Sequence, residues 1–300
     1  MIDLHTHFFS RPFFDTLAAL SPQPGTNEEK LAAATKKAGI ELPEPDVDVH
    51  LARWLGEMDK HGVEHMVTFA SLPEEVPAVL QATSKSGGKL TPFAIVNPTA
   101  EGAKDKVAAL LGQKGVKGLL LFPAMHKYDP SGDAALSVLE VANQHSAFAI
   151  VHCGLLHVKF RDLLGIPRPF DYRFANPLNL VPAANRCRNV KFVIPHFGAG
   201  MLRETLMVGS ECENVHVDTS SSNAWMATQE QPTELKTVLA RALGVFGADR
   251  VLFGTDSSTF PRGWNRAIYE AQKTALETLG TSAADQAKVF GGNAKRLLGL

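Results

Sequence analysis

The sequence lacks an excess of charge of either sign. Its 30 lysine and arginine residues nearly balance 31 aspartate and glutamate residues, so the formal net charge is −1. Nucleic-acid-binding domains usually carry a basic excess or stripe, and this balance argues against such a partner. No apolar run approaches the roughly 20 residues that cross a bilayer, and no basic segment followed by an apolar one marks a secretory signal. We therefore expect neither nucleic acid nor a membrane among its partners.

Cysteine is also scarce. The chain has three cysteines, Cys153, Cys187 and Cys212, an odd number without C-x-x-C spacing. A disulfide framework uses pairs of cysteines, and a thioredoxin-like redox site needs the C-x-x-C spacing. We therefore expect reduced thiols in a cytoplasmic protein, each with a packing role.

What the sequence does contain is an alternation of strand-like and helix-like segments over all 300 residues. The strand-like segments are short and rich in Val, Ile, Leu and Phe, as parallel strands buried on both faces are. They are Met1–His5, His65–Ala70, Leu90–Val96, Val116–Phe122, Phe148–His152, Val190–His196, Asn214–Thr219 and Arg250–Thr255. Amphipathic segments such as 134–143, 232–246 and 268–279 lie between them. This alternation predicts an α/β fold, a single (β/α)8 TIM barrel domain over residues 1–300.

A doubly wound open sheet uses the same alternation, but no glycine-rich phosphate-binding motif follows the first strand, which weakens this alternative. Two long insertions interrupt the rhythm, residues 8–47 after the first strand and residues 155–174 after the fifth. Both insertions follow carboxyl ends of strands, where barrel enzymes hold their active sites. We therefore expect them to form lids or substrate walls. Packing or oligomer contacts are the alternative. The tail from Ser282 to Leu298 predicts a C-terminal helix, capped by Ser282 with Asp285 in the capping-box position.

Side chains that bind metal ions stand at the ends of four predicted strands. His5 and His7 end the first strand, and residues i and i+2 of a strand point to the same side. His152 ends the fifth strand, His196 ends the sixth, and Asp256 follows the eighth. A lone histidine at a strand end is more often a hydrogen-bonded loop residue than a metal ligand, and an aspartate after Gly-Thr is often only a turn or cap residue. In a barrel, however, these ends converge on one mouth, and several imidazoles with one carboxylate suit Zn²⁺ or a similar divalent ion.

Together these strand ends resemble those of the amidohydrolase superfamily, specifically the amidohydrolase-related branch that includes aminocarboxymuconate-semialdehyde decarboxylase and the resorcylate decarboxylases. The matching motifs are, in chain order, His5-x-His7, Val151-His152, Pro195-His196-Phe197-Gly198 and Phe253-Gly254-Thr255-Asp256. The resemblance covers nearly the whole chain and is specific to the superfamily, without identifying a substrate. It implies one metal ion held by His5, His7, His152 and Asp256, with His196 close by as an acid/base or additional ligand. It also implies a homodimer.

A bridging lysine is absent from the place where many superfamily members carry one. Those members bridge two metal ions with a carboxylated lysine at the end of the fourth strand, which here ends at Phe122. Lys117 lies near the start of that strand, and Lys127 lies in the loop that follows it. We therefore expect a mononuclear site, with zinc as the first choice and manganese or iron as alternatives.

Two reactions suit this set of residues. In a hydrolysis, Asp256 accepts a proton from water that the metal acidifies, while His196 polarises the substrate carbonyl or moves the proton. The same site supports non-oxidative decarboxylation of an aromatic or unsaturated carboxylic acid. A metal-dependent hydrolase is our main hypothesis and a carboxy-lyase the alternative. The complete ligand set and His196 argue against a third reading, an inactive metal-binding barrel.

Basic and aromatic residues that follow the strand ends indicate the kind of substrate. Arg262, Arg161 and Arg173 are candidates to grip a carboxylate, because guanidinium groups pair with carboxylates through two hydrogen bonds. Trp264 is a candidate wall for a planar ring. We therefore expect a small anionic, carboxylated substrate, aromatic or a lactone, with Arg262 as the preferred anchor. A solvated rim is the alternative for each of these side chains.

A second pair of polar residues alternates on the seventh predicted strand, His216 and Asp218. Either could orient a ligand histidine through a hydrogen bond. Hydrogen bonding inside the barrel without a catalytic role is an equally good interpretation.

Overall fold

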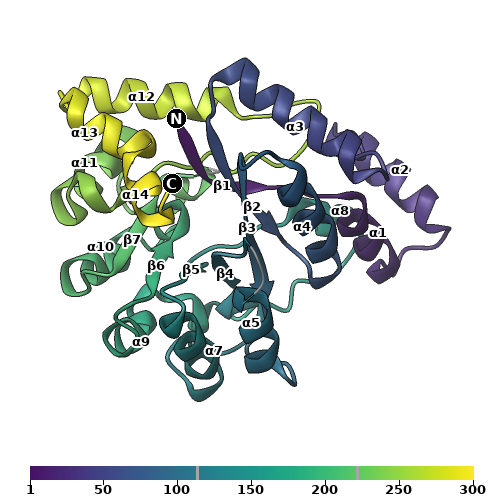
Figure 1. Cartoon of the computed structure of the whole chain (residues 1–300), viewed down its shortest axis with the longest axis horizontal. Coiled ribbons are helices and arrows are strands. Elements are labelled where there is room, and N and C mark those ends of the chain that lie inside the picture. The colour runs from purple at the N-terminus through teal and green to yellow at the C-terminus, as the bar shows by residue number, and fades with distance from the viewer. Residues whose placement is uncertain (113–114, 221–222) are drawn as a thin grey trace.

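Eight parallel strands form the central barrel of the molecule (Figure 1). The computed structural model describes residues 1–112, 115–220 and 223–300. The strands are β1 (Ile2–His7), β2 (His65–Ala70), β3 (Leu90–Val96), β4 (Gly118–Leu121), β5 (Phe148–Val151), β6 (Lys191–Ile194), β7 (Val215–Asp218) and β8 (Val251–Leu252). They pair in chain order from β1 to β8. The predicted (β/α)8 TIM barrel is confirmed; β2 and β3 have the expected bounds, and the bounds of the other strands differ from the expected ones by a few residues.

The chain beyond β8 runs along β1 and brings the barrel close to closure. The amide of Leu4 donates to the carbonyl of Phe253 at 2.9 Å, and a parallel bridge pairs Thr6 with Ser257. The predicted eighth strand extended to Thr255, but only Val251–Leu252 pair with β7. These contacts place the end of β8 beside the histidines of β1.

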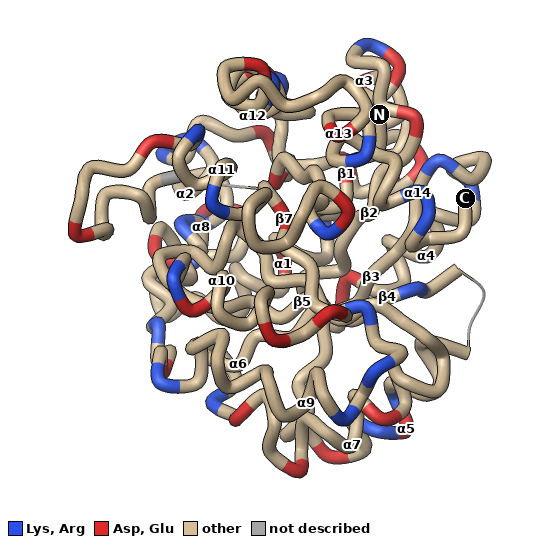
Figure 2. Tube along the Cα trace, turned by 90° about the vertical axis from the view of Figure 1, so that its left-hand side faces the viewer, with Lys and Arg blue, Asp and Glu red and all other residues tan. Residues whose placement is uncertain are grey.

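Helices surround the barrel and connect its strands (Figure 1). They are α1 (Arg11–Leu20), α2 (Asn27–Ala38), α3 (Val47–His61), α4 (Val76–Lys85), α5 (Ala103–Gly112), α6 (Pro123–His126), α7 (Asp133–Gln144), α8 (Lys159–Leu163), α9 (Val181–Arg186), α10 (Leu202–Glu211), α11 (Leu235–Phe246), α12 (Arg266–Thr278), α13 (Ala283–Ala287) and α14 (Asn293–Leu298). Acidic and basic residues are intermingled over the face shown in Figure 2. Within the described ranges, no helix is both long enough and apolar enough to cross a membrane.

Two apolar layers account for the composition of the strands. Side chains that point inward, such as Leu4, Phe93 and Val193, fill the barrel, and outward ones pack against the helices. Because both faces are covered, the strands read as nearly continuous apolar runs rather than alternating ones.

The insertion at residues 8–47 folds into two helices instead of an irregular loop. Helix α2 begins with a complete capping box between Thr26 and Glu29. Helices α1, α2 and α8 lie side by side (Figure 1), so the two insertions pack on each other. Their shared apolar cluster includes Phe14, Leu31 and Leu164. Both insertions thus stand together at the carboxyl end of the barrel.

The C-terminal tail differs from the single helix that its pattern predicts. Ser282 caps α13 as expected, since its hydroxyl accepts from the amide of Asp285 at 3.1 Å. A wide π-helical turn, Lys288–Gly292, then separates α13 from α14. Gly291 has a φ of 157°, and a Cβ there would lie 2.9 Å from the amide nitrogen of Ile2. The tail is bent because it packs closely against the start of β1.

Candidate metal centre and active site

The strand ends bring the predicted metal-binding side chains into one cavity. This cavity has a volume of about 800 Å³ and opens at the carboxyl ends of the strands. His5, His7, His152, His196 and Asp256 all line it. The structure therefore gathers five residues that lie as far as 251 positions apart in the sequence.

Three of these residues converge most closely. The Nε2 atom of His7 lies 3.2 Å from Oδ1 of Asp256, and the Nε2 atom of His5 lies 3.7 Å from the same oxygen. One ligand atom from each residue lies within 4.8 Å of the other two. The amide of Asp256 donates to the carbonyl of His5 at 2.9 Å, which fixes the carboxylate opposite the two rings. Asp256 has a φ of 58°, so the backbone turns sharply there.

Glycine at position 254 permits this close approach. A Cβ on Gly254 would lie 2.8 Å from the Cβ atoms of both His5 and Ser220. Any larger residue would push β1 and β7 away from the end of β8. The Gly-Thr-Asp motif therefore serves packing as well as chemistry.

His152 and His196 form the other side of the group. Their ring centroids are 5.4 Å apart, and those of His196 and His5 are 4.8 Å apart. His152 lies outside the three-residue group around Asp256 but faces the same cavity. Burial, and repulsion from His196 and His5 when those rings are protonated, lower the pKa of His152 to about 3. Its imidazole is therefore neutral near pH 7, the form that binds a metal ion.

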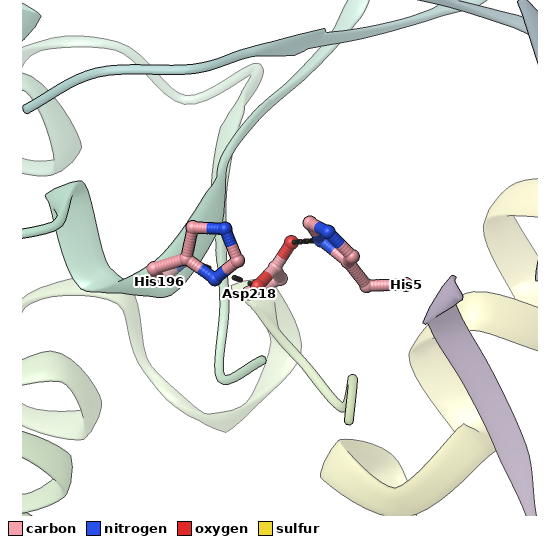
Figure 3. Close-up of side chains that lie close together, drawn as sticks. All are labelled: His5, His196 and Asp218. Carbon is pink, nitrogen blue, oxygen red and sulfur yellow. Dashed lines mark hydrogen bonds and ion pairs between the residues drawn. The ribbon is translucent and has the colours of Figure 1, made fainter. Parts of the chain in front are cut away.

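Asp218 orients the histidines from behind (Figure 3). Its Oδ2 atom accepts a hydrogen bond from Nδ1 of His5 at 2.8 Å, and its Oδ1 atom accepts from the amide of His196 at 3.1 Å. Burial opposes ionisation, but the positive charge and hydrogen bond of His5 keep the pKa of Asp218 below its usual range. The prediction that a strand β7 residue orients a ligand histidine agrees with this contact for Asp218. His216 instead bonds the carbonyl of Phe192 at 3.2 Å.

The hydrogen bonds select the tautomers of the rings. A carboxylate or carbonyl only accepts, so Nδ1 of His5 and of His196 each carry a proton, donated to Asp218 and to the carbonyl of Ser220 at 2.7 Å. Nδ1 of His7 bonds the hydroxyl of Ser71 at 2.7 Å. In neutral His5 and His196, Nε2 therefore keeps its lone pair. Two imidazole nitrogens beside one carboxylate form a donor set that fits a divalent metal ion.

Two buried carboxyl groups support this site and were missed by the sequence reasoning. Asp3 accepts from the amide of His5 at 3.0 Å and from the hydroxyl of Thr255 at 2.6 Å, which ties β1 to the residue before Asp256. Glu75 accepts from the amide of Ser71 at 2.7 Å, and Ser71 is the residue whose hydroxyl bonds His7. Asp3 could have been identified from the sequence, because it precedes His5 by two residues and so lies on the same side of the strand. No pattern in the sequence pointed to Glu75.

The predicted substrate contacts divide into two groups. Arg161 and Arg262 line the cavity, and Arg262 donates to the hydroxyl of Ser258 at 3.1 Å. Trp264 does not line it, because its ring is buried and its indole nitrogen donates to Asp3 at 2.8 Å. Arg173 does not either, because its side chain is 85% exposed and pairs with Asp171 at 2.6 Å. The predictions for Trp264 and Arg173 are therefore corrected.

Replacing Asp218 with asparagine is expected to weaken metal binding about tenfold to hundredfold, since outer partners of ligand histidines have effects of this size. The change preserves the shape of the side chain and removes the charge that faces His5. Competition with a chelator measures the affinity. Asp59→Asn is the control, an exposed carboxylate that pairs with Lys89. Equal affinities for the Asp218→Asn variant and the wild type would contradict the orienting role.

Known structures with this architecture cover the whole chain. A 5-carboxyvanillate decarboxylase from Sphingomonas paucimobilis has 15% identity and a TM-score of 0.67, with coverage of 100% of this chain and 99% of its own. A probable 2-pyrone-4,6-dicarboxylic acid hydrolase from Acinetobacter baumannii has 15% identity, the same coverage and a TM-score of 0.63. An amidohydrolase from Burkholderia multivorans with bound zinc also has 15% identity and the same coverage, with a TM-score of 0.64. At these identities the similarity establishes the fold.

Sequence comparison is informative at the level of the family. A search of curated protein sequences finds no significant match. The amidohydrolase family model Amidohydro_2, however, matches residues 2–300, almost the entire chain. The chain therefore belongs to the amidohydrolase family and is an enzyme of that family.

Proposed function

We propose that this enzyme is a metal-dependent hydrolase of a small carboxylated substrate. The observation that carries the proposal is the Asp256 carboxylate, within 3.7 Å of Nε2 of both His5 and His7. We assign His5, His7, His152 and Asp256 as ligands of one divalent ion. Zinc is the first choice because a structural relative holds it, with manganese or iron as alternatives. Such an ion would supply a Lewis acid that acidifies water and polarises a carbonyl.

Asp256 and His196 carry the proton transfers in this proposal. Burial opposes the charge of Asp256, but the hydrogen bond from His7 and the positive ring of His5 hold its pKa well below the usual range. The carboxylate is therefore ionised and accepts a proton from the attacking water. His196 has a pKa lowered by burial, and its Nε2 lone pair takes up a proton and delivers it to the leaving group. Arg262 and Arg161 are proposed to hold the substrate carboxylate.

A carboxy-lyase is the second candidate, favoured by the apolar floor of the cavity. Phe69, Ile95, Leu120 and Ile150 from the barrel interior line it next to the histidines. A substrate carboxylate near such a surface loses part of its hydration, which favours its conversion to neutral CO₂. His196, once it has taken up a proton from solvent at Nε2, would donate it to the substrate carbon, after which the bond from that carbon to the carboxylate breaks, CO₂ leaves and the ring is neutral again. Structural relatives include 2,6-dihydroxybenzoate decarboxylase from Rhizobium.

Measuring acid and CO₂ release side by side distinguishes the two reactions. The metal-loaded enzyme is supplied with carboxylated lactones, esters and aromatic carboxylates, including 2-pyrone-4,6-dicarboxylate and 2,6-dihydroxybenzoate. We expect acid release without CO₂, lost on removal of the metal. CO₂ release that depends on Asp256 and His196 would overturn the hydrolase in favour of the carboxy-lyase.

A further inference from the structure

A row of aromatic rings leads from the candidate metal centre into the two insertions. His7 stacks on Phe9 with ring centroids 4.7 Å apart, and Phe9 stacks on Phe13 at 4.0 Å. Phe13 meets Phe14 edge to face at 5.2 Å, and Phe14 meets Phe160 of α8 at 5.0 Å. All of these rings line the same cavity. The cavity is therefore continuous from the histidines to the region between α1, α2 and α8.

The part of this cavity formed by the first insertion, which we call the far chamber, is apolar. Leu17 of α1, Ala38 of α2 and Ile40 complete it beside Phe13 and Phe14. None of these side chains carries a charge or a hydrogen-bonding group. Charged residues of the same cavity, Lys159, Arg161 and Asp162, come from α8 and not from the first insertion. Against the side chains of the first insertion a charged group would lose hydration without gaining a partner, whereas burying an apolar group there is favourable.

The volume of the cavity exceeds what a single-ring substrate needs. An engineered protein cavity of roughly 150 Å³ is enough to bind benzene, and this cavity has about 800 Å³. A single ring with a carboxylate at the histidines would leave the far chamber unfilled. The space suits a ligand in the size range of typical small-molecule sites, roughly 300–1,000 Å³.

We infer that the substrate carries a second, bulky apolar group that occupies the far chamber while its carboxylated end lies at the histidines. This inference rests on the proposed function, because it takes the histidines and Asp256 as the reacting end of the cavity. It narrows the substrate class from small carboxylates to amphiphilic ones, such as an aryl or alkyl-substituted aromatic acid. The first insertion then acts as a specificity element and not as a packing excursion.

Calorimetric titration of the zinc-loaded protein with benzoate and with biphenyl-4-carboxylate tests this inference. Both probes have the same acidic end, and the second adds one phenyl ring. We expect biphenyl-4-carboxylate to bind roughly 10- to 100-fold more tightly, the gain expected from burying a side chain the size of phenylalanine. Equal or weaker binding of the larger probe, including no binding, would overturn the inference.

A pair of tryptophan variants on α2 tests whether the second phenyl ring of biphenyl-4-carboxylate binds in the far chamber. Ala38 lines the chamber and is half-buried, whereas Ala33 on the same helix is exposed and outside the cavity. Ala38→Trp should remove most of the gain for biphenyl-4-carboxylate and leave benzoate affinity within about twofold, while Ala33→Trp should change neither. If Ala38→Trp leaves the gain intact, or weakens both probes equally, the assignment of the far chamber is wrong.

Binding and turnover separate this inference from the proposed function. Tighter binding of biphenyl-4-carboxylate than of benzoate, without metal-dependent turnover of any tested substrate, would count against the proposed function alone. Metal-dependent turnover, with equal affinities for benzoate and biphenyl-4-carboxylate, would count against the far chamber alone.

Discussion

Replacing His5 and His7 together with alanine is expected to reduce bound metal from about one ion per chain to none and to abolish activity. Catalytic zinc sites use three protein ligands and an open position, and this double variant removes two of the proposed ligands. The Nε2 atoms of both rings approach Asp256, so its carboxylate would lose both of these neighbours. Elemental analysis of the purified protein and an activity assay measure the two losses.

The control for the histidine variant is His145→Ala, an exposed histidine at the end of α7. It removes an imidazole without altering the cavity, so metal content should stay at about one ion per chain, the stoichiometry of a mononuclear site. Far-ultraviolet circular dichroism verifies that the double variant remains folded. Metal retained at the wild-type level in a folded double variant would overturn the assignment of these histidines.

Replacing Asp256 with asparagine is expected to lower kcat by about 10²- to 10⁴-fold, the contribution typical of a positioned acid/base. Asparagine has the same shape and tolerates the left-handed backbone that Asp256 adopts at φ 58°. The fold should therefore persist while the proton-accepting carboxylate is lost. Steady-state kinetics at saturating metal measure the effect, since the variant also loses one proposed ligand.

Asp249→Asn is the matched control for the loss of a carboxylate. Asp249 precedes β8, at the opposite end of the strand from Asp256, and it does not line the cavity. It is exposed and pairs with Lys288 at 3.2 Å. The kcat of the Asp249→Asn variant should equal that of the wild type. A kcat for Asp256→Asn within a few fold of the wild type would show that another group accepts the proton.

Several features could be predicted from the sequence because they depend on local composition. Eight short apolar runs separated by amphipathic segments specify strands covered on both faces, and this pattern leaves few architectures. Polar residues directly after such runs necessarily reach the carboxyl end of the barrel. The placement of His5 and Asp256 in one cavity follows from that rule.

Predictions failed where the direction of a side chain depended on distant partners. Trp264 lies near Asp256 in the sequence, but its indole turns inward to Asp3, 261 positions away. Arg173 follows the fifth strand as expected, yet it pairs with Asp171 in solvent because that carboxylate is two residues away. The tail pattern predicted one helix, but close packing of Gly291 on Ile2 bends it.

The sequence by itself determined the barrel, the two insertions and the kinds of side chain at the strand ends, since these follow from the periodicity of apolar residues. Only the tertiary structure decided which atoms of those side chains face one another. The hydrogen bonds from His5 to Asp218 and from His196 to Ser220 fix the protonated nitrogens and leave Nε2 available. The tertiary structure also formed the far chamber, because the residues of the first insertion that line it come together only when α1, α2 and α8 pack on one another.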